Sequence, residues 1–218
     1  MPEMKARSCS TLFDFGVLAR EYDRWYDTPA GRAYDRVQKW DVRHLLRRAR
    51  PGERLLEVGC GTGHWCSFFA SMGYEVFGVD VSAEMIAVAR GSVGGCRFEV
   101  GDGCALRFED GSFDVSAAMA TLEFVGDPAL AVREMARCVR PGGSLVVGVL
   151  NRLSPLNRRR LAKGKSPYVF GRLFAPEELR RLLSPYGGVR MVASACCGRD
   201  RRSRNGLEGP LIVAEVRR

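Results

Sequence analysis

The stretch Leu55-Leu56-Glu57-Val58-Gly59-Cys60-Gly61-Thr62-Gly63 decides the fold. Its first four residues have the apolar character of a buried strand, and they run directly into three glycines spaced two apart. Glycines at that point let the chain turn sharply and let a ligand lie against bare backbone. A helical pattern follows over His64–Met72, and a helix start offers unpaired N–H groups. The stretch therefore predicts a strand–turn–helix unit with a ligand site at the turn.

Strands and helices alternate along the rest of the chain. Short apolar runs indicate strands, and apolar residues three or four apart indicate helices. The chain predicts strands over Arg54–Val58, Glu75–Val79, Cys96–Val100, Phe113–Ala118, Ser144–Val149, Val189–Ala195 and Pro210–Val216. It predicts helices over Phe13–Tyr26, Gly31–Arg50, His64–Met72, Ala83–Arg90, Pro128–Val139 and Glu177–Leu183. This order indicates an α/β fold: a Rossmann-like, seven-stranded, mostly parallel sheet with helices on both faces and an antiparallel last strand.

The length of 218 residues suits one domain with a small appendage. Residues 1–50 are expected to form an N-terminal helical cap, and residues 51–218 a ligand-binding domain with a basic, irregular lid insertion at residues 151–174. Lys and Arg outnumber Asp and Glu by 34 to 25, and much of the excess lies in the insertion and in Arg199–Arg204. A basic surface attracts nucleic acid, anionic lipid or acidic small molecules, although an ordinary solvated face explains the same charge.

The eight cysteines do not form the pattern of a disulfide framework, because several fall inside predicted strands and helices. Reduced thiols in a cytoplasm are therefore expected, and no metal site is predicted. The vicinal pair Cys196–Cys197 is expected to be buried in a strand rather than to bind a soft metal. The first ten residues hold no apolar signal segment, and the apolar run Leu145–Leu150 is too short to span a bilayer.

The spacing of the glycines distinguishes between cofactors. A dinucleotide fingerprint reads G-x-G-x-x-G, and the helix after it neutralises a pyrophosphate. This chain reads G-x-G-x-G and places the acidic Glu57 before it. S-adenosylmethionine (SAM) has no phosphate, and its sulfonium and ammonium groups suit a carboxylate that would repel a pyrophosphate. The motif therefore favours SAM.

Acidic residues follow the next two predicted strands. Asp80 ends the strand Glu75–Val79, where a carboxylate can accept hydrogen bonds from both ribose hydroxyls. Asp102 follows the strand that ends at Val100 and is placed to accept from the adenine amino group. The alternatives are a helix-capping residue at Asp80 and an ordinary turn residue at Asp102. Together with the glycine turn, the two carboxylates indicate a nucleoside site.

Four segments carry a resemblance to a known family. LLEVGCGTG (55–63), FGVDVS (77–82), GDGCALRFEDGSFD (101–114) and VRPGGSLVVGVL (139–150) resemble class I SAM-dependent methyltransferases of the UbiE/type 11 kind. YDRWYDTP (22–29) also resembles the segment that precedes the domain in related proteins. The resemblance implies transfer of a methyl group from SAM to a small-molecule acceptor, with S-adenosylhomocysteine as product. One departure is Phe124, where relatives often have a histidine, so a proton relay there is excluded.

The resemblance also implies which residues meet SAM. The glycine turn would meet the methionine end, the two aspartates the ribose and adenine, and the segment after the fourth strand the sulfonium. In chain order, the implied cofactor-binding residues are Glu57, Gly59, Cys60, Gly61, Asp80, Val81, Met85, Asp102, Gly103, Ala120 and Thr121.

The sequence leaves the catalytic groups open. Methyl transfer is an in-line displacement that depends mainly on proximity and orientation, and a base is needed only if the acceptor must lose a proton. The candidates are His64, Glu123, Tyr22 and Tyr26. His64 is expected to face solvent or the edge of the cofactor rather than to act as a base, and the resemblance implies that the two tyrosines close over the cofactor.

The acceptor is expected between the N-terminal helices and the insertion. An acidic acceptor would suit the basic side chains there, and an aromatic acceptor the apolar ones, although simple packing explains them equally well. These side chains are Arg158, Arg159, Arg160, Lys163, Lys165, Tyr168, Phe170 and Phe174. O-, N-, C- and S-methylation all fit the motifs, and no pattern predicts an oligomeric state.

Three other functions fit parts of the pattern. The first is a non-catalytic SAM-binding sensor or partner subunit. The second is an RNA or DNA methyltransferase, which is disfavoured because Ala120-Thr121-Leu122-Glu123 differs from the [DNS]-P-P-[YF] segment that grips a flipped base. The third, an NAD-dependent dehydrogenase, is disfavoured by the glycine spacing.

Overall fold

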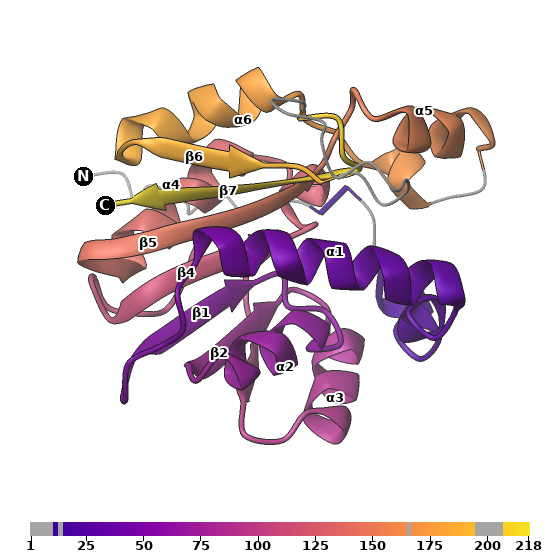
Figure 1. Ribbon diagram of the computed structural model, residues 1–218. Helices are drawn as coiled ribbons and strands as arrows, with labels where there is room; N and C mark the ends of the chain where they lie inside the picture. The colour runs from indigo at the N-terminus through magenta and orange to yellow at the C-terminus, as the bar shows by residue number, and fades with distance from the viewer. Residues whose placement is uncertain (1–10, 13–14, 165–166, 195–206) are drawn as a thin grey trace, which may run out of the picture.

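The computed structural model describes residues 11–12, 15–164, 167–194 and 207–218 (Figure 1). They contain one seven-stranded sheet in the order β3-β2-β1-β4-β5-β7-β6. Its strands are β1 (Arg54–Val58), β2 (Glu75–Asp80), β3 (Arg97–Val100), β4 (Phe113–Met119), β5 (Val139–Leu150), β6 (Val189–Val192) and β7 (Leu211–Arg217). The α-helices are α1 (Pro29–Leu45), α2 (His64–Ser71), α3 (Ala83–Ser92), α4 (Pro128–Cys138), α5 (Pro155–Ala162) and α6 (Pro176–Leu183).

The sheet has the predicted mixed topology. Strands β1 to β5 are parallel, whereas β7 lies antiparallel between β5 and β6. Helices cover both faces, with α1, α2 and α3 on one side and α4 and α6 on the other (Figure 1). Each face buries its own apolar cluster, exemplified by Phe69 and Ile86 on the first side and by Met135 and Leu179 on the second. The predicted Rossmann-like fold is confirmed.

The N-terminal region differs from the prediction. In place of a helix over Phe13–Tyr26, the described residues form two short 3-10 turns, η1 (Phe15–Leu18) and η2 (Tyr22–Trp25). Helix α1 begins at Pro29, because the Thr28 hydroxyl accepts a hydrogen bond from the Gly31 N–H at 2.9 Å and Pro29 needs no partner for its nitrogen. The helix ends at Leu45 instead of Arg50.

Strand β5 begins five residues earlier than predicted, at Val139. The expected turn at Pro141-Gly142-Gly143 lies inside the strand, where the register against β4 shifts. Arg218 makes this possible, because its backbone carbonyl accepts from the Gly142 N–H at 2.8 Å and its own N–H donates to the Gly143 carbonyl at 3.0 Å. A partner so distant in the sequence is invisible to local pattern analysis.

The insertion at residues 151–174 was predicted to be irregular, and this was wrong. It contains α5 and the 3-10 turn η4 (Pro167–Phe170). Strand β6 stops at Val192, three residues short of the prediction. The loop that was expected to join the last two strands lies outside the described residues over 195–206, as do Cys196, Cys197 and Lys165.

Candidate cofactor site and active site

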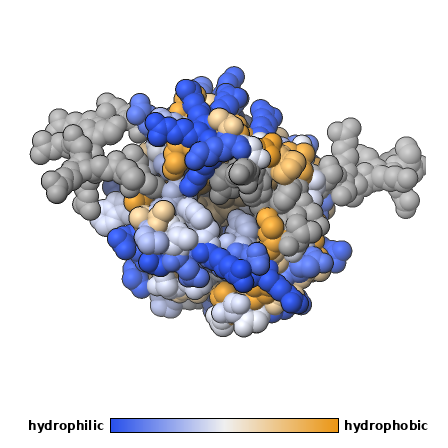
Figure 2. All heavy atoms as spheres, turned by 90° about the vertical axis from the view of Figure 1, so that its right-hand side faces the viewer, coloured by the Kyte–Doolittle hydropathy of each residue, from blue (hydrophilic) through white to orange (hydrophobic). Residues whose placement is uncertain are grey.

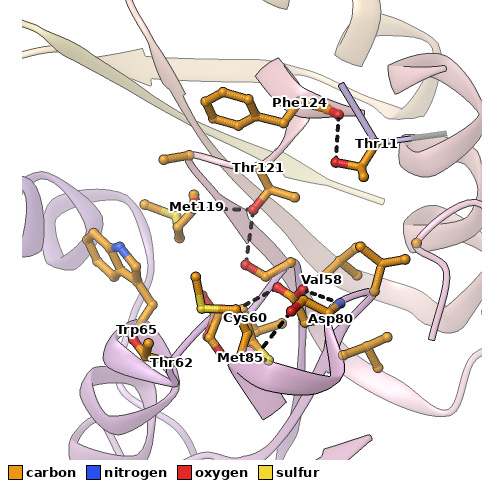
Figure 3. Close-up of a pocket in the computed structure, with 18 of the residues that line it drawn as sticks. Thr11, Val58, Cys60, Thr62, Trp65, Asp80, Met85, Met119, Thr121 and Phe124 are labelled. Atoms are coloured by element: carbon orange, nitrogen blue, oxygen red, sulfur yellow. Dashed lines mark hydrogen bonds between the residues drawn. The ribbon is translucent and has the colours of Figure 1, made fainter. Parts of the chain in front are cut away.

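A pocket lies at the carboxyl ends of β1, β2 and β4 (Figure 3). Figure 3 shows Cys60, Asp80 and Met85 on one side of this pocket, with Met119 and Thr121 across from them. Every residue that the sequence assigned to the cofactor lines it: Glu57, Gly59, Cys60, Gly61, Asp80, Val81, Met85, Asp102, Gly103, Ala120 and Thr121. Residues up to 64 positions apart in the chain thus share one pocket, because parallel strands end at one edge of the sheet.

The glycine turn has a backbone that favours glycine, and Gly59 has no room for a side chain. Gly59, Gly61 and Gly63 have φ angles of +70°, +52° and +85°, a region that favours glycine. A Cβ atom on Gly59 would lie 2.1 Å from Thr121 Cγ2. The Thr121 hydroxyl also donates to the Gly59 carbonyl at 3.2 Å, so the turn is held against the tip of β4.

Asp80 connects the glycine turn to the turn after β2. Its Oδ2 accepts from the Gly61 N–H at 2.8 Å, and its Oδ1 accepts from the Ser82 N–H at 2.9 Å. A carboxylate oxygen can accept more than one hydrogen bond, so these contacts are compatible with ribose hydroxyls as additional donors. The Asp80 carboxylate therefore holds the two turns of the pocket together as well as lining it.

Asp102 has the geometry of a turn residue at the rim of the same pocket. Its Oδ1 accepts from the Cys104 N–H at 2.8 Å.

Cys104 is disulfide-bonded, so the expectation of reduced thiols throughout the chain is wrong for this cysteine. Cys60, Cys66, Cys96 and Cys138 are free thiols.

Glu57 is a buried carboxyl that reaches the pocket. It is 1% exposed, and the Cys66 thiol donates to its Oε2 at 2.9 Å. Burial raises the pKa of Glu57 to about 8, because the charged form loses its hydration. A cation bound beside this side chain would favour the ionised form.

The raised pKa predicts that stability depends on pH. The folded chain retains a proton on Glu57 up to about pH 8, whereas the unfolded carboxyl releases it near 4.5. The free energy of unfolding from this group is therefore fully present below 4.5 and falls by about 1.4 kcal/mol per pH unit up to about 8. Urea unfolding at pH 5.5, 6.5 and 7.5 measures this fall. We expect the free energy of unfolding to fall less steeply in Glu57→Gln than in the wild type, by about 1.4 kcal/mol per pH unit.

The matched control for this experiment is Glu99→Gln, because Glu99 is exposed at the end of β3. We expect the control to keep the wild-type pH dependence. An identical slope in Glu57→Gln and in the wild type would show that Glu57 is already ionised in the folded chain.

Of the candidate bases, His64 has a ring nitrogen that lies between two charged side chains, Asp35 and Lys39. Its Nε2 lies 2.7 Å from Asp35 Oδ1 and 3.2 Å from Lys39 Nζ, and Lys39 pairs with the second oxygen of Asp35 at 2.7 Å. Partial burial acts to raise the pKa of Asp35, but the hydrogen bonds from His64 and Lys39 outweigh it and lower the pKa below the ordinary value. An ionised Asp35 accepts a hydrogen bond from the Nε2–H group of His64, which leaves the lone pair of a neutral imidazole on Nδ1.

Two tyrosines from the N-terminal region complete this side of the pocket. Tyr26 stacks on the His64 ring with centroids 3.9 Å apart, and Tyr22 lines the pocket beside it. Asp23, between them, accepts from the Thr62 hydroxyl at 2.9 Å, so the segment is fixed to the glycine turn. The N-terminal region thus contributes directly to the pocket wall.

Glu123 is not brought into the pocket. It is fully buried, its Oε1 accepts from the Leu150 N–H, and its Oε2 has no hydrogen-bond partner among the described residues. Burial raises the pKa of Glu123 to about 7. Because this carboxyl lies beneath the lining, it has no access to an acceptor in the pocket.

The sequence missed several residues of the lining. Trp65 and Met119 were within reach of prediction, since each adjoins a motif residue. Thr11 was not, because it arrives by a bridge to Val125 far along the chain. The additional lining residues are Thr11, Val58, Thr62, Trp65, Val79, Ser82, Gly101, Met119, Phe124 and Val125.

Of the insertion residues that were expected to meet the acceptor, those whose side chains the structure describes do not line the pocket. Arg160 instead packs over the rings of Trp25 and Tyr34, with its Cζ 5.7 and 5.3 Å from their centroids. Phe174 is buried in the core, and Phe170 is 55% exposed.

Among the described residues, no group of His, Cys, Asp and Glu side chains has the form of a metal site, and no helix is long and apolar enough to cross a membrane.

Comparison with known proteins agrees with this geometry. Residues 56–147 match the methyltransferase domain family of type 11. The chain is 35% identical over 185 residues to an uncharacterized protein of Mycobacterium tuberculosis, and this match covers 83% of the chain and 61% of that protein. It is 36% identical over 133 residues to a demethylmenaquinone methyltransferase of Beutenbergia cavernae, covering 61% of the chain and 55% of the relative. The chain thus spans about three fifths of the length of these relatives.

A solved structure supports the same assignment over nearly the whole chain. A SAM-dependent methyltransferase of Thermotoga maritima, described as a possible histamine N-methyltransferase, superposes with a TM-score of 0.77. It is 28% identical, and the match covers 93% of this chain and 97% of that one. Residues 56–147 therefore match the type 11 methyltransferase domain family, and 93% of the chain is similar to a SAM-dependent methyltransferase of known structure.

Proposed function

We propose that the chain transfers a methyl group from SAM to a small-molecule acceptor by in-line displacement. One observation carries the proposal: the glycine turn, Asp80 and the buried Glu57 line a single pocket together with four aromatic residues. The aromatic part of the lining consists of Tyr22, Tyr26, Trp65 and Phe124. It favours a flat or aromatic acceptor, which is also compatible with the names of the demethylmenaquinone and possible histamine methyltransferases.

The residues present fit SAM better than a dinucleotide. No Lys or Arg side chain of the described residues lines the pocket, so nothing there neutralises a pyrophosphate. The carboxyls of Glu57 and Asp80 face it instead, and they suit a cationic amino acid end and a ribose. Gly59 lies against Thr121 with no space for a Cβ, which leaves bare backbone for close approach.

The chain contributes position rather than covalent chemistry. SAM supplies the reactive methyl group, whose bond to sulfur breaks with its electron pair as the bond to the acceptor forms. Tyr26, stacked on His64, and the buried Trp65 contribute aromatic surface to the lining, which would shield the reacting atoms from water. Holding the acceptor in line accounts for most of the rate, because well-oriented reactants gain about 7–11 kcal/mol over free ones.

His64 becomes important only when the acceptor must lose a proton. We expect His64→Gln to lower kcat at least about a hundredfold with a phenol or alcohol. With a tertiary amine, which has no proton to lose, we expect less than about a threefold change, because only positioning is needed. Glutamine can still donate to Asp35, so SAM affinity serves as the control. An equal loss on both acceptor types would assign His64 to positioning alone.

The experiment that tests the proposal is release of S-adenosylhomocysteine from SAM in the presence of a panel of quinols, phenols, aromatic amines and thiols. We expect turnover with at least one aromatic member. Tight binding of SAM with no turnover on any acceptor would favour the sensor or partner subunit instead.

A further inference from the structure

The insertion at residues 151–174 combines positive charge with exposed apolar side chains. It contains seven Lys or Arg residues and no Asp or Glu. Half of the exposed large hydrophobic side chains in the described part of the chain also lie there: Leu153 (45%), Leu156 (39%), Val169 (40%) and Phe170 (55%). Apolar side chains that gather on a surface mark a contact site, whereas scattered ones do not.

Helix α5 presents both kinds of side chain on one face. Leu156, Arg159 and Lys163 are spaced three and four residues apart, so they lie in one row, and all three are exposed. In Figure 1, α5 lies at one end of the molecule. Figure 2 faces this end and shows strongly hydrophilic side chains next to hydrophobic ones in the region of α5.

The opposite side of α5 is fixed to the domain. Asn157 is fully buried, and its Nδ2 donates to the Asn151 carbonyl at 2.9 Å and to the Pro210 carbonyl at 2.7 Å. Arg160 packs over the rings of Trp25 and Tyr34. The outward face is therefore held in place by rigid contacts, as a docking surface requires.

The composition of this face identifies the partner. A nucleic acid would meet the cations but would leave Leu153, Leu156 and Val169 in water. A bilayer with anionic lipids satisfies both, because headgroups attract Lys and Arg while leucine and valine side chains enter the acyl boundary. Arg152 pairs with Glu178 at 3.3 Å, but Arg159 and Lys163 form no ion pair with any residue that the structure describes.

We propose that the described part of the insertion, residues 151–164 and 169–174, docks the chain on a membrane surface rich in anionic lipid. The segment adjoins the pocket, since a Cβ on Gly171 would lie 2.7 Å from the Phe124 ring. Docking would therefore place the pocket next to the bilayer, and an apolar acceptor concentrates in the bilayer. That consequence rests on the proposed function, whereas docking itself does not.

Sedimentation of the full chain with vesicles tests the proposal. We expect at least about tenfold tighter binding to equimolar phosphatidylglycerol and phosphatidylcholine than to phosphatidylcholine alone. The double variant Arg159→Glu/Lys163→Glu should weaken binding to the anionic vesicles at least about thirtyfold. The matched control is Arg107→Glu/Arg133→Glu, which changes the net charge equally at exposed residues outside the insertion and should stay within about threefold.

A second variant tests the apolar contribution at constant charge. We expect Leu153→Ser/Leu156→Ser to weaken vesicle binding about tenfold, with thermal unfolding to show that the chain still folds. Three results would overturn the proposal: equal binding to neutral and anionic vesicles, an equal loss in the control variant, or tighter binding to single-stranded RNA that the serine variant leaves unchanged.

Discussion

Substituting Gly59 by alanine is expected to abolish SAM binding and to destabilise the fold. The new Cβ would lie 2.1 Å from Thr121 Cγ2 and 2.5 Å from its hydroxyl, and the φ angle of +70° is unfavourable for alanine. The two effects together should lower the free energy of unfolding by roughly 2–4 kcal/mol. The turn must also move away from β4, so we expect SAM affinity to fall at least about a hundredfold, as measured by calorimetry.

Gly52→Ala separates the clash from the backbone strain. Gly52 has a similar φ angle of +79°, but a Cβ there would meet nothing within 4 Å. The control should lose about 1 kcal/mol of stability and keep its SAM affinity. If Gly59→Ala bound SAM as well as Gly52→Ala does, the glycine turn would not be the cofactor cradle.

Asp80→Ala is the second substitution with a large expected effect. It removes the acceptor for the Gly61 and Ser82 N–H groups and, in our proposal, for the ribose hydroxyls. Hydrogen bonds to a charged acceptor contribute about 1.5–3 kcal/mol each, so we expect SAM affinity to fall at least about a hundredfold.

Asp127→Ala tests whether Asp80 acts merely as a capping residue. Asp127 caps α4 by accepting from the Leu130 N–H at 3.0 Å, and it does not line the pocket. This control should cost about 1 kcal/mol of stability with no change in SAM affinity. Equal SAM affinities in the two variants would contradict a binding role for Asp80.

The sequence was most informative where local pattern and ligand chemistry coincide. The glycine turn, Asp80 and Asp102 each follow a strand, and parallel strands place such residues at one edge without further information. The topology was predictable for the same reason, because alternating strands and helices allow few arrangements.

The remaining features depend on contacts between distant residues. Thr11 reaches the pocket through a bridge to Val125, and Asp35 on α1 binds His64 across 29 positions. The hydrophobic periodicity of the sequence does not reveal contacts between residues so far apart. Glu123 was placed among the candidate bases because it follows β4, but a one-residue difference along a 3-10 turn buries Glu123 and puts Phe124 in the lining. The extension of β5 likewise depends on Arg218.

Calorimetric titration of the wild-type chain with SAM, S-adenosylhomocysteine and NAD tests the central claim most directly. The geometry predicts micromolar or tighter binding of the first two, a free energy of about −8 kcal/mol or below, and no measurable binding of NAD. A folded chain that binds NAD, or that binds none of the three, would contradict the assignment of this pocket to SAM.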